Sequence, residues 1–168
     1  MKKYLFIFLL LFNPSLSFSQ DGIYFLDVDL LINKSDSGKK IVLKLKKINE
    51  KNIEELESYE KELKKEDEEI NKIKNILSKE EMNNKIQELK EKIAIYRSKK
   101  DKIFKDYNNL KNKEIEIYFK SITPYIEDFM EENSIKLIMD KKNIFIANSN
   151  YDITDPLINF LNKKIDND

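Results

Sequence analysis

Apolar residues recur every seven positions through the middle of the chain, between residues 41 and 122, where there is neither glycine nor proline. The repeat has two sets that are out of phase with each other. The first set has Tyr59 and Ile73 in its companion row and consists of Leu56, Leu63, Ile70 and Leu77. The second has Ile86, Ile93 and Tyr107 beside it and consists of Leu89, Tyr96, Ile103, Leu110 and Ile117. This spacing predicts helices that pack through a coiled-coil seam.

The stretch LSKEEMNN separates the two sets. Ser78 and Glu81 have the spacing of a capping box, so a helix can restart there. Two helices of similar length with a short connection fold back on each other most economically. We therefore expect an antiparallel hairpin over residues 45–119, an arm of about 50 Å that is too long to bury its outer faces within one subunit. One continuous helix is the alternative, but the cap and the phase shift favour the hairpin.

Both ends of the chain carry continuous apolar runs instead of heptads. IYFLDV, from residue 23, predicts a strand buried on both faces. Asp29 is predicted to cap a short helix, which NKSDSGKK ends at its Ser, Asp and Gly38. Further on, IKLIMD and NIFIAN, joined by DKKN, predict a β-hairpin. The last helix is predicted to start at Thr154-Asp155-Pro156 and to bury Leu157, Ile158, Phe160 and Leu161.

Thr123-Pro124 is predicted to begin a separate short helix, with Thr as the N-cap and Pro at the first helical position. A proline kink within a continuing helix is the alternative.

These elements predict an α+β fold with two parts. Residues 20–44 and 120–168 would form a small β-rich oligomerisation body, and residues 45–119 the arm. Strands such as IYFLDV and LIM would expose a large apolar surface in a single copy, so we expect a homo-oligomer.

The first 19 residues have the pattern of a secretory signal peptide. Lys2 and Lys3 precede an apolar core at residues 4–12, and Ser17-Phe18-Ser19 forms a small-x-small cleavage site. The core is too short to span a bilayer, which favours cleavage after Ser19 over a retained membrane anchor. We expect an exported, soluble mature protein.

The amino-acid composition excludes several classes of function. Charged residues make up 37% of the chain, and cysteine and histidine are absent. Their absence excludes disulfides, thiol nucleophiles, Ser-His-Asp triads and the usual zinc sites. Without Lys2 and Lys3 the basic residues fall from 31 to 29 against 31 acidic ones, a net charge of −2. Since only Arg97 is an arginine, specific nucleic-acid binding is not expected.

Two groups of carboxylates could suggest acid-base or cation-binding chemistry. Asp27 and Asp29 lie two residues apart, and Asp152, Thr154 and Asp155 precede the last helix. The free N–H groups and the dipole of a helix N-terminus attract such side chains, so capping is favoured over catalysis. We predict no enzyme activity, no cofactor and no metal.

Several apolar residues lie off the two seams: Ile53, Ile76, Ile95, Phe104 and Phe119. Packing where the seam of the hairpin widens is the simpler interpretation. The functional interpretation is that some of them offer scattered apolar contacts to a client chain.

The order of these segments resembles the Skp (OmpH) family of periplasmic outer-membrane-protein chaperones over essentially the whole mature chain. The resemblance is carried by FLDVDLL followed by SDSGKK, and by LIMDKKNIFIANSNYDITDPLINFLNK. It implies a trimer whose β-rich body bears three helical arms around a cavity. Such proteins hold unfolded outer-membrane β-barrel proteins in the periplasm without ATP, and many are basic and engage clients or anionic membrane surfaces. This chain is nearly neutral.

The predicted function is therefore an ATP-independent periplasmic holdase that binds unfolded outer-membrane proteins between helical arms. Its contacts would be weak and multiple, so avidity would replace a single tight site. An exported coiled-coil scaffold without chaperone activity is the alternative.

Overall fold

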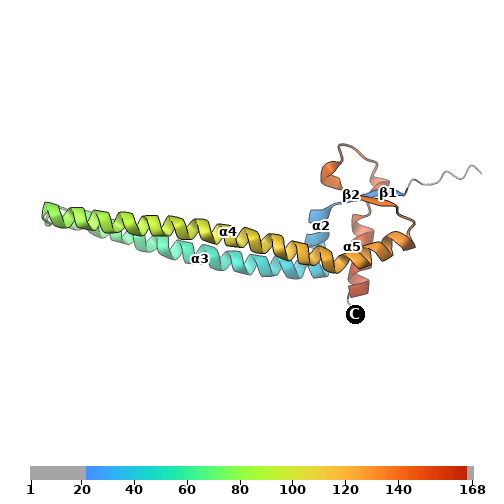
Figure 1. The fold of residues 1–168 in the computed structure, drawn as a ribbon, viewed down its shortest axis with the longest axis horizontal. Coiled ribbons are helices and arrows are strands. Elements are labelled where there is room, and N and C mark those ends of the chain that lie inside the picture. The colour runs from blue at the N-terminus through green and yellow to red at the C-terminus, as the bar shows by residue number, and fades with distance from the viewer. Residues whose placement is uncertain (1–21, 166–168) are drawn as a thin grey trace, which may run out of the picture.

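A long two-helix arm projects from a small body in the computed structural model, which describes residues 22–165 (Figure 1). The elements in chain order are β1 (Ile23–Leu26), α2 (Val28–Lys34), α3 (Asp36–Ile73), α4 (Lys79–Glu132), β2 (Leu137–Asp140) and α5 (Thr154–Ile165). Short 3-10 turns occupy Lys141–Asn143 and Ser149–Tyr151. The α+β class and the helical hairpin are confirmed, and the single continuous helix is wrong. The expected signal peptide lies outside the described residues.

The turn of the hairpin is the capping box that the sequence predicted. The Oγ of Ser78 accepts a hydrogen bond from the backbone N of Glu81 at 3.3 Å, and the carboxylate of Glu81 accepts one from the backbone N of Ser78 at 2.9 Å. Each side chain satisfies a free donor of the first turn of α4. The second helix therefore starts at a locally encoded signal.

Ion pairs between the two helices define the antiparallel register of the arm. Near the body, Lys44 of α3 pairs with Glu114 of α4 at 2.8 Å, and further out Glu66 pairs with Lys92 at 2.6 Å. Between these pairs the seam buries Leu56, as predicted. Residues of α3 that lie further from the body are thus paired with residues of α4 that come earlier in the chain.

At the end of the arm nearest the body, the buried residues of α4 differ from the predicted seam. Ile117 is 51% exposed, whereas the next residue, Tyr118, is only 2% exposed. The buried positions of α4 continue at Ile122 and Phe129, so their phase has shifted. The reason is a change of partner, since this part of α4 packs against body residues as well as α3.

The first helix after β1 begins earlier in the sequence than predicted. Asp27, and not Asp29, is the N-cap of α2, and its carboxylate accepts a hydrogen bond from the backbone N of Leu30 at 2.9 Å. As predicted, α2 ends within NKSDSGKK at its first Ser, since Ser35 is the C-cap of α2. Ser35 also caps α3, so Asp36 and Gly38 lie inside α3 and do not end a helix.

The helix α4 runs without interruption through Pro124, so the separate helix predicted from Thr123 is wrong and the continuing helix is right. Proline leaves the carbonyl four residues earlier without its helical donor. The neighbouring Ile122 is fully buried in the body, and this packing holds the backbone in helix.

The described part of the chain contains one sheet, in which β1 and β2 pair in parallel. The whole arm forms the crossover between the two strands, because parallel strands cannot be joined by a tight turn. The predicted β-hairpin of IKLIMD and NIFIAN is wrong within one chain: only Leu137–Asp140 is a strand, and the chain turns away at Lys141–Asn143. The predicted burial of β1 on both faces holds only at its end, where Phe25 and Leu26 point to opposite faces and are both buried, whereas Ile23 is half-exposed.

The body core lies where α2, α5 and the end of α4 meet one face of the sheet. As predicted, α5 starts at Thr154 and buries Leu157, Ile158 and Leu161, while Phe160 is only partly buried. The Phe160 ring meets Phe129 of α4 edge to face at 5.2 Å.

Candidate functional site

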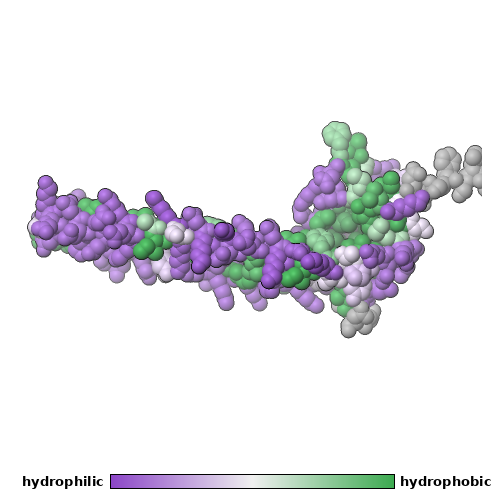
Figure 2. Space-filling view, viewed as in Figure 1, coloured by the Kyte–Doolittle hydropathy of each residue, from purple (hydrophilic) through white to green (hydrophobic). Residues whose placement is uncertain are grey.

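The off-seam apolar residues of the sequence analysis occupy two kinds of environment. Ile53, Ile76, Ile95 and Phe104 are exposed on the arm, Ile76 by 82% and Ile95 by 68%. Phe119 instead packs against the body core, with its ring 5.4 Å from that of Tyr118. Figure 2 shows the arm as a mainly hydrophilic surface with separate hydrophobic patches. Four of the five residues are thus free to touch another chain.

Ile53 and Phe104 lie at about the same level of the arm. Ile53 follows Lys44 by nine residues, and Phe104 precedes Glu114 by ten, while Lys44 and Glu114 are paired across the hairpin. Both helices rise by the same amount per residue, so the two side chains lie at a similar distance from the body. The middle of the arm therefore presents apolar groups from both helices.

A shallow groove of about 230 Å³ lies further out between the helices. Its apolar lining comes from Leu63, Ile95 and the rings of two tyrosines, and its charged lining from Glu62, Glu66, Lys92 and Lys99. The ammonium group of Lys99 lies 4.1 Å from the centroid of the Tyr59 ring. Tyr59 was predicted as a seam residue, but it is exposed at the edge of this groove, so the sequence analysis missed the groove.

Hydrogen bonds across the hairpin fix the charged and phenolic groups around the groove. The hydroxyl of Tyr96 donates to the carboxylate of Glu60, which raises the pKa of Tyr96 to about 12. The hydrogen bond to Glu66 raises the pKa of Lys92, and that to Glu55 raises the pKa of Lys99. Each lysine is thus held in place at the groove by a carboxylate of α3.

The body has its own exposed apolar face. Ile23 pairs in register with Leu137 in the parallel sheet, so the two side chains lie on the same face, together with Met139. All three are at least 38% exposed. The other face, with Tyr24 and Ile138, packs on the core. One side of the sheet is thus covered, and the other side is open at these three residues although Phe25 on the same side is buried.

The segment after β2 exposes still more apolar surface. The side chains of Phe145 and Ile146 are 102% and 83% exposed, and they lie in NIFIAN, which forms no strand in this chain. In Figure 1 the chain between β2 and α5 loops away from the body, and Figure 2 shows hydrophobic surface at its end. Two neighbouring apolar side chains that are this exposed indicate a contact with another protein surface.

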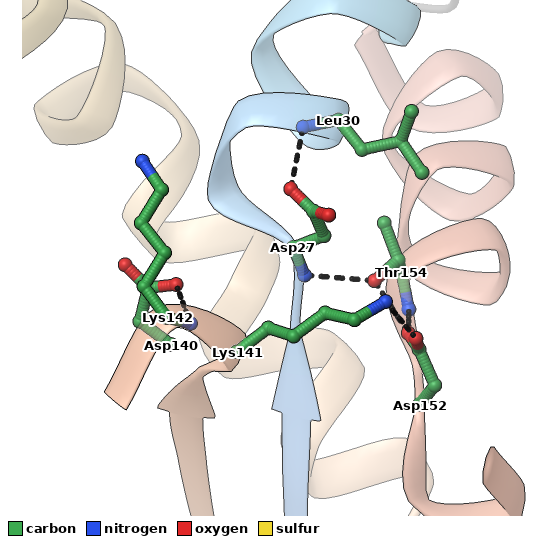
Figure 3. Close-up of polar contacts among 7 residues, drawn as sticks. All are labelled: Asp27, Leu30, Asp140, Lys141, Lys142, Asp152 and Thr154. Carbon is green, nitrogen blue, oxygen red and sulfur yellow. Dashed lines mark hydrogen bonds and ion pairs between the residues drawn. The ribbon is translucent and has the colours of Figure 1, made fainter. Parts of the chain in front are cut away.

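The carboxylates that could have suggested acid-base chemistry hold the body together (Figure 3). The backbone N of Asp27 donates to the Oγ1 of Thr154 at 2.8 Å, which links the end of β1 to the start of α5. Asp152 accepts hydrogen bonds from the Oγ1 of Thr154 at 2.5 Å, from the backbone N of Thr154 at 3.0 Å and from Lys141 at 3.2 Å. Burial alone would raise the pKa of Asp152, but these hydrogen bonds outweigh it, and the net shift is downward.

Asp29, the other carboxylate of the pair, forms an ion pair with Lys142 at 2.7 Å and points toward solvent. Asp27 and Asp29 therefore have separate partners.

The sequence profile of the family described as outer membrane protein (OmpH-like) matches residues 22–161, which is nearly all of the described chain. The chain belongs to the OmpH-like family. The resemblance stated from the two ends of the sequence is thereby confirmed. A search of curated proteins finds no match to this OmpH-like chain.

The fold of the OmpH-like chain has a counterpart among solved structures. A crystal structure from Caulobacter crescentus CB15, provisionally assigned as an outer membrane chaperone (OmpH-like), aligns with a TM-score of 0.70 and 18% sequence identity over 85% of each chain. This agreement extends to the hairpin and the body. Between residues 22 and 165 no helix is long and apolar enough to cross a membrane.

Proposed function

We propose that this OmpH-like protein is an ATP-independent periplasmic holdase that binds unfolded outer-membrane β-barrel proteins and prevents their aggregation. The observation that carries the proposal is the set of exposed apolar side chains along a charged arm, Ile53, Ile76, Ile95 and Phe104. Coiled-coil packing leaves these residues uncovered, although burying each would be favourable. The similarity of fold to a provisionally assigned outer membrane chaperone supports the same proposal.

The separation of the apolar groups fits a client that has no fixed structure. Each contact is small, and the charged residues between contacts keep the arm soluble. Several weak contacts to one flexible chain raise the total affinity through effective concentration. Such a surface holds many sequences without selecting one.

We assign residues 20–44 and 120–168 to an assembly body and residues 45–119 to the arm. The open face of the sheet, with Ile23, Leu137 and Met139, and the exposed Phe145 and Ile146 support a homo-oligomer, because together they would leave a large apolar surface in water. Three copies, with a cavity between three arms, is the arrangement that the family resemblance implies. Transient contact with a membrane surface is part of the same expectation.

Export is proposed from residues 1–19, with cleavage after Ser19. Expression of the full chain with measurement of the mass of the mature periplasmic protein tests both the location and the cleavage site. A mature N-terminus at Gln20 supports the proposal, and an uncleaved chain in the inner membrane contradicts it.

The function is tested by diluting an unfolded outer-membrane β-barrel protein into buffer with the mature protein and no ATP, and following light scattering. Suppression that saturates at a fixed ratio of chaperone to client is expected. If an intact oligomer leaves aggregation unchanged, the holdase proposal is wrong, and a coiled-coil scaffold becomes the better interpretation.

A further inference from the structure

The two helices of the arm carry opposite charge at the same level. Residues 54–69 of α3 contain nine carboxylates and three lysines, whereas residues 90–105 of α4 contain six lysines, one arginine and two carboxylates. The ion pairs of Lys92 with Glu66 at 2.6 Å and of Lys99 with Glu55 at 2.5 Å hold these two stretches side by side. An excess of six negative charges on α3 therefore faces an excess of five positive charges on α4.

Pairing within the arm leaves charges unused on both helices. Only three carboxylates of this α3 stretch, Glu55, Glu60 and Glu66, form ion pairs across the hairpin. Four other exposed charges make no ion pair or hydrogen bond to any described residue: Glu54 and Glu57 on α3, and Lys102 and Lys105 on α4. Negative charge thus remains on one helix and positive charge on the other.

The helical repeat places these four charges on the outer edges of the arm. Leu56 and Ile103 are seam residues that face the partner helix. Glu54 lies two residues before Leu56, and Lys105 two residues after Ile103, a rotation of roughly 200° from the seam in each case. Glu57 and Lys102, one residue from the same seam positions, extend the two edges. We call Glu54 and Glu57 the acidic edge, and Lys102 and Lys105 the basic edge.

We propose that the acidic edge of one arm contacts the basic edge of the arm of a neighbouring copy. This inference rests on the homo-oligomer of the proposed function. In a closed ring the copies are related by rotation, so all arms point the same way and equal levels meet. The two edges of an arm lie on opposite helices at one level, so each arm can offer its acidic edge to one neighbour and its basic edge to the other.

Such contacts would hold the arms together when no client is bound. Phe104 is half-exposed and follows the seam residue Ile103, so it lies on the opposite side of the helix from Lys102 and stays open to the client when the basic edge is in contact. Exposed ion pairs are weak and are screened by salt. A client that offers several apolar contacts can therefore displace them, which makes the closed arrangement reversible.

The arrangement is tested by distances between arms. The chain has no cysteine, so an Asn84→Cys variant carries one label per copy, on an exposed position near the tip. Electron-electron distance measurements on the spin-labelled oligomer are expected to shift to longer values from about 0.1 M to about 1 M salt, where the Debye length falls from about 10 Å to about 3 Å.

Charge reversal separates this contact from a general effect of salt. In the labelled protein, Lys102→Glu with Lys105→Glu should lengthen the distances at low salt. Adding Glu54→Lys and Glu57→Lys should restore the short distances, because the two edges are then complementary again. The matched control, Lys111→Glu with Lys113→Glu, changes the same charge on α4 outside the stretch and should leave the distances unchanged.

Each outcome has a distinct meaning. An oligomer whose distances respond neither to salt nor to reversal of either edge overturns this inference and leaves the holdase intact. Reversal of the basic edge that lowers client capture without moving the arms also overturns it, and assigns that edge to acidic client segments. A protein that sediments as a monomer overturns the oligomer itself.

Discussion

The hydroxyls of Ser35 and Tyr118 lie 2.8 Å apart in the buried junction where the arm leaves the body. Ser35 ends α2 and caps α3, and Tyr118 lies on α4, so this one hydrogen bond joins three helices. The Oγ of Ser35 also accepts from the backbone N of Gly38 at 3.2 Å. The direction of the arm relative to the body therefore depends on a small polar contact inside an apolar core.

Replacing Tyr118 with phenylalanine should destabilise the protein by about 1 kcal/mol, because the buried hydroxyl of Ser35 loses one of its two hydrogen-bond partners and keeps only Gly38. Urea unfolding followed by circular dichroism at a fixed protein concentration measures the loss. Tyr107→Phe on the same helix is the matched control, since its hydroxyl makes no hydrogen bond to any described residue. Equal midpoints for the two variants would contradict the role given to Tyr118.

Alkaline pH should weaken the same junction. Burial raises the pKa of Tyr118, although the hydrogen bond with Ser35 works against this shift. The folded state thus favours the neutral phenol. The stability that this preference contributes is complete below the ordinary tyrosine pKa of about 10, and is lost as the pH rises through the raised value. The urea midpoint should fall above about pH 10, and should fall less steeply in Tyr118→Phe. Parallel curves for the two proteins would be inconsistent with this assignment.

The features that were predictable from sequence depend on residues close together in the chain. Ser78 and Glu81 form their capping box within four residues, and the heptads of α3 and α4 repeat over several turns, so the hairpin could be derived. The positions of Ile53, Ile95 and Phe104 off the seam were also predictable, but the simpler interpretation, that they pack where the seam widens, is wrong because all three are exposed. Local signals of this kind retain their meaning in any fold.

The errors arose where a distant partner decides the outcome. Asp27 and Asp29 are equally good caps, but Asp27 is fixed at the end of β1 by Thr154, 127 residues away. NIFIAN has strand composition without a strand partner in its own chain. The seam shifts from Ile117 to Tyr118 where α4 meets the body. No local pattern contains that information.

Alanine at Gly38 should disturb the start of the arm. A Cβ at this position would lie 2.1 Å from the carbonyl oxygen of Ile32, so the backbone of α2 or α3 must move. Forcing atoms into a packed site costs typically about 1 to 3 kcal/mol. Thermal unfolding should show a lower midpoint for Gly38→Ala and no change for Lys40→Ala, which alters an exposed side chain of the same turn. A midpoint equal to that of the parent protein would show that the backbone at the junction can move to accept the Cβ without a loss of stability.

Aspartates at Phe145 and Ile146 should prevent assembly and leave each copy folded. Both side chains are exposed in a single copy, so the change removes no internal packing, but it places charge in the proposed interface. Sedimentation velocity should show a shift from oligomer to monomer, with unchanged helical circular dichroism. Two aspartates at Asn148 and Asn150, exposed in the same segment, provide the control for added charge. Persistence of the oligomer in the Phe145/Ile146 variant would exclude this segment from the interface.

Serine at Ile95 and Phe104 should reduce holdase activity while leaving the oligomer intact. Both side chains are at least half exposed on the arm, so their loss removes apolar contacts to the client without opening the seam. Because the proposed binding is multivalent, the double variant should need several times more protein than the parent to suppress aggregation of the same client. The comparison is Ile103→Val, which trims the seam beside Phe104 and changes none of the exposed contacts. Full suppression by the double serine variant at the parent's ratio would mean that clients bind elsewhere on the protein.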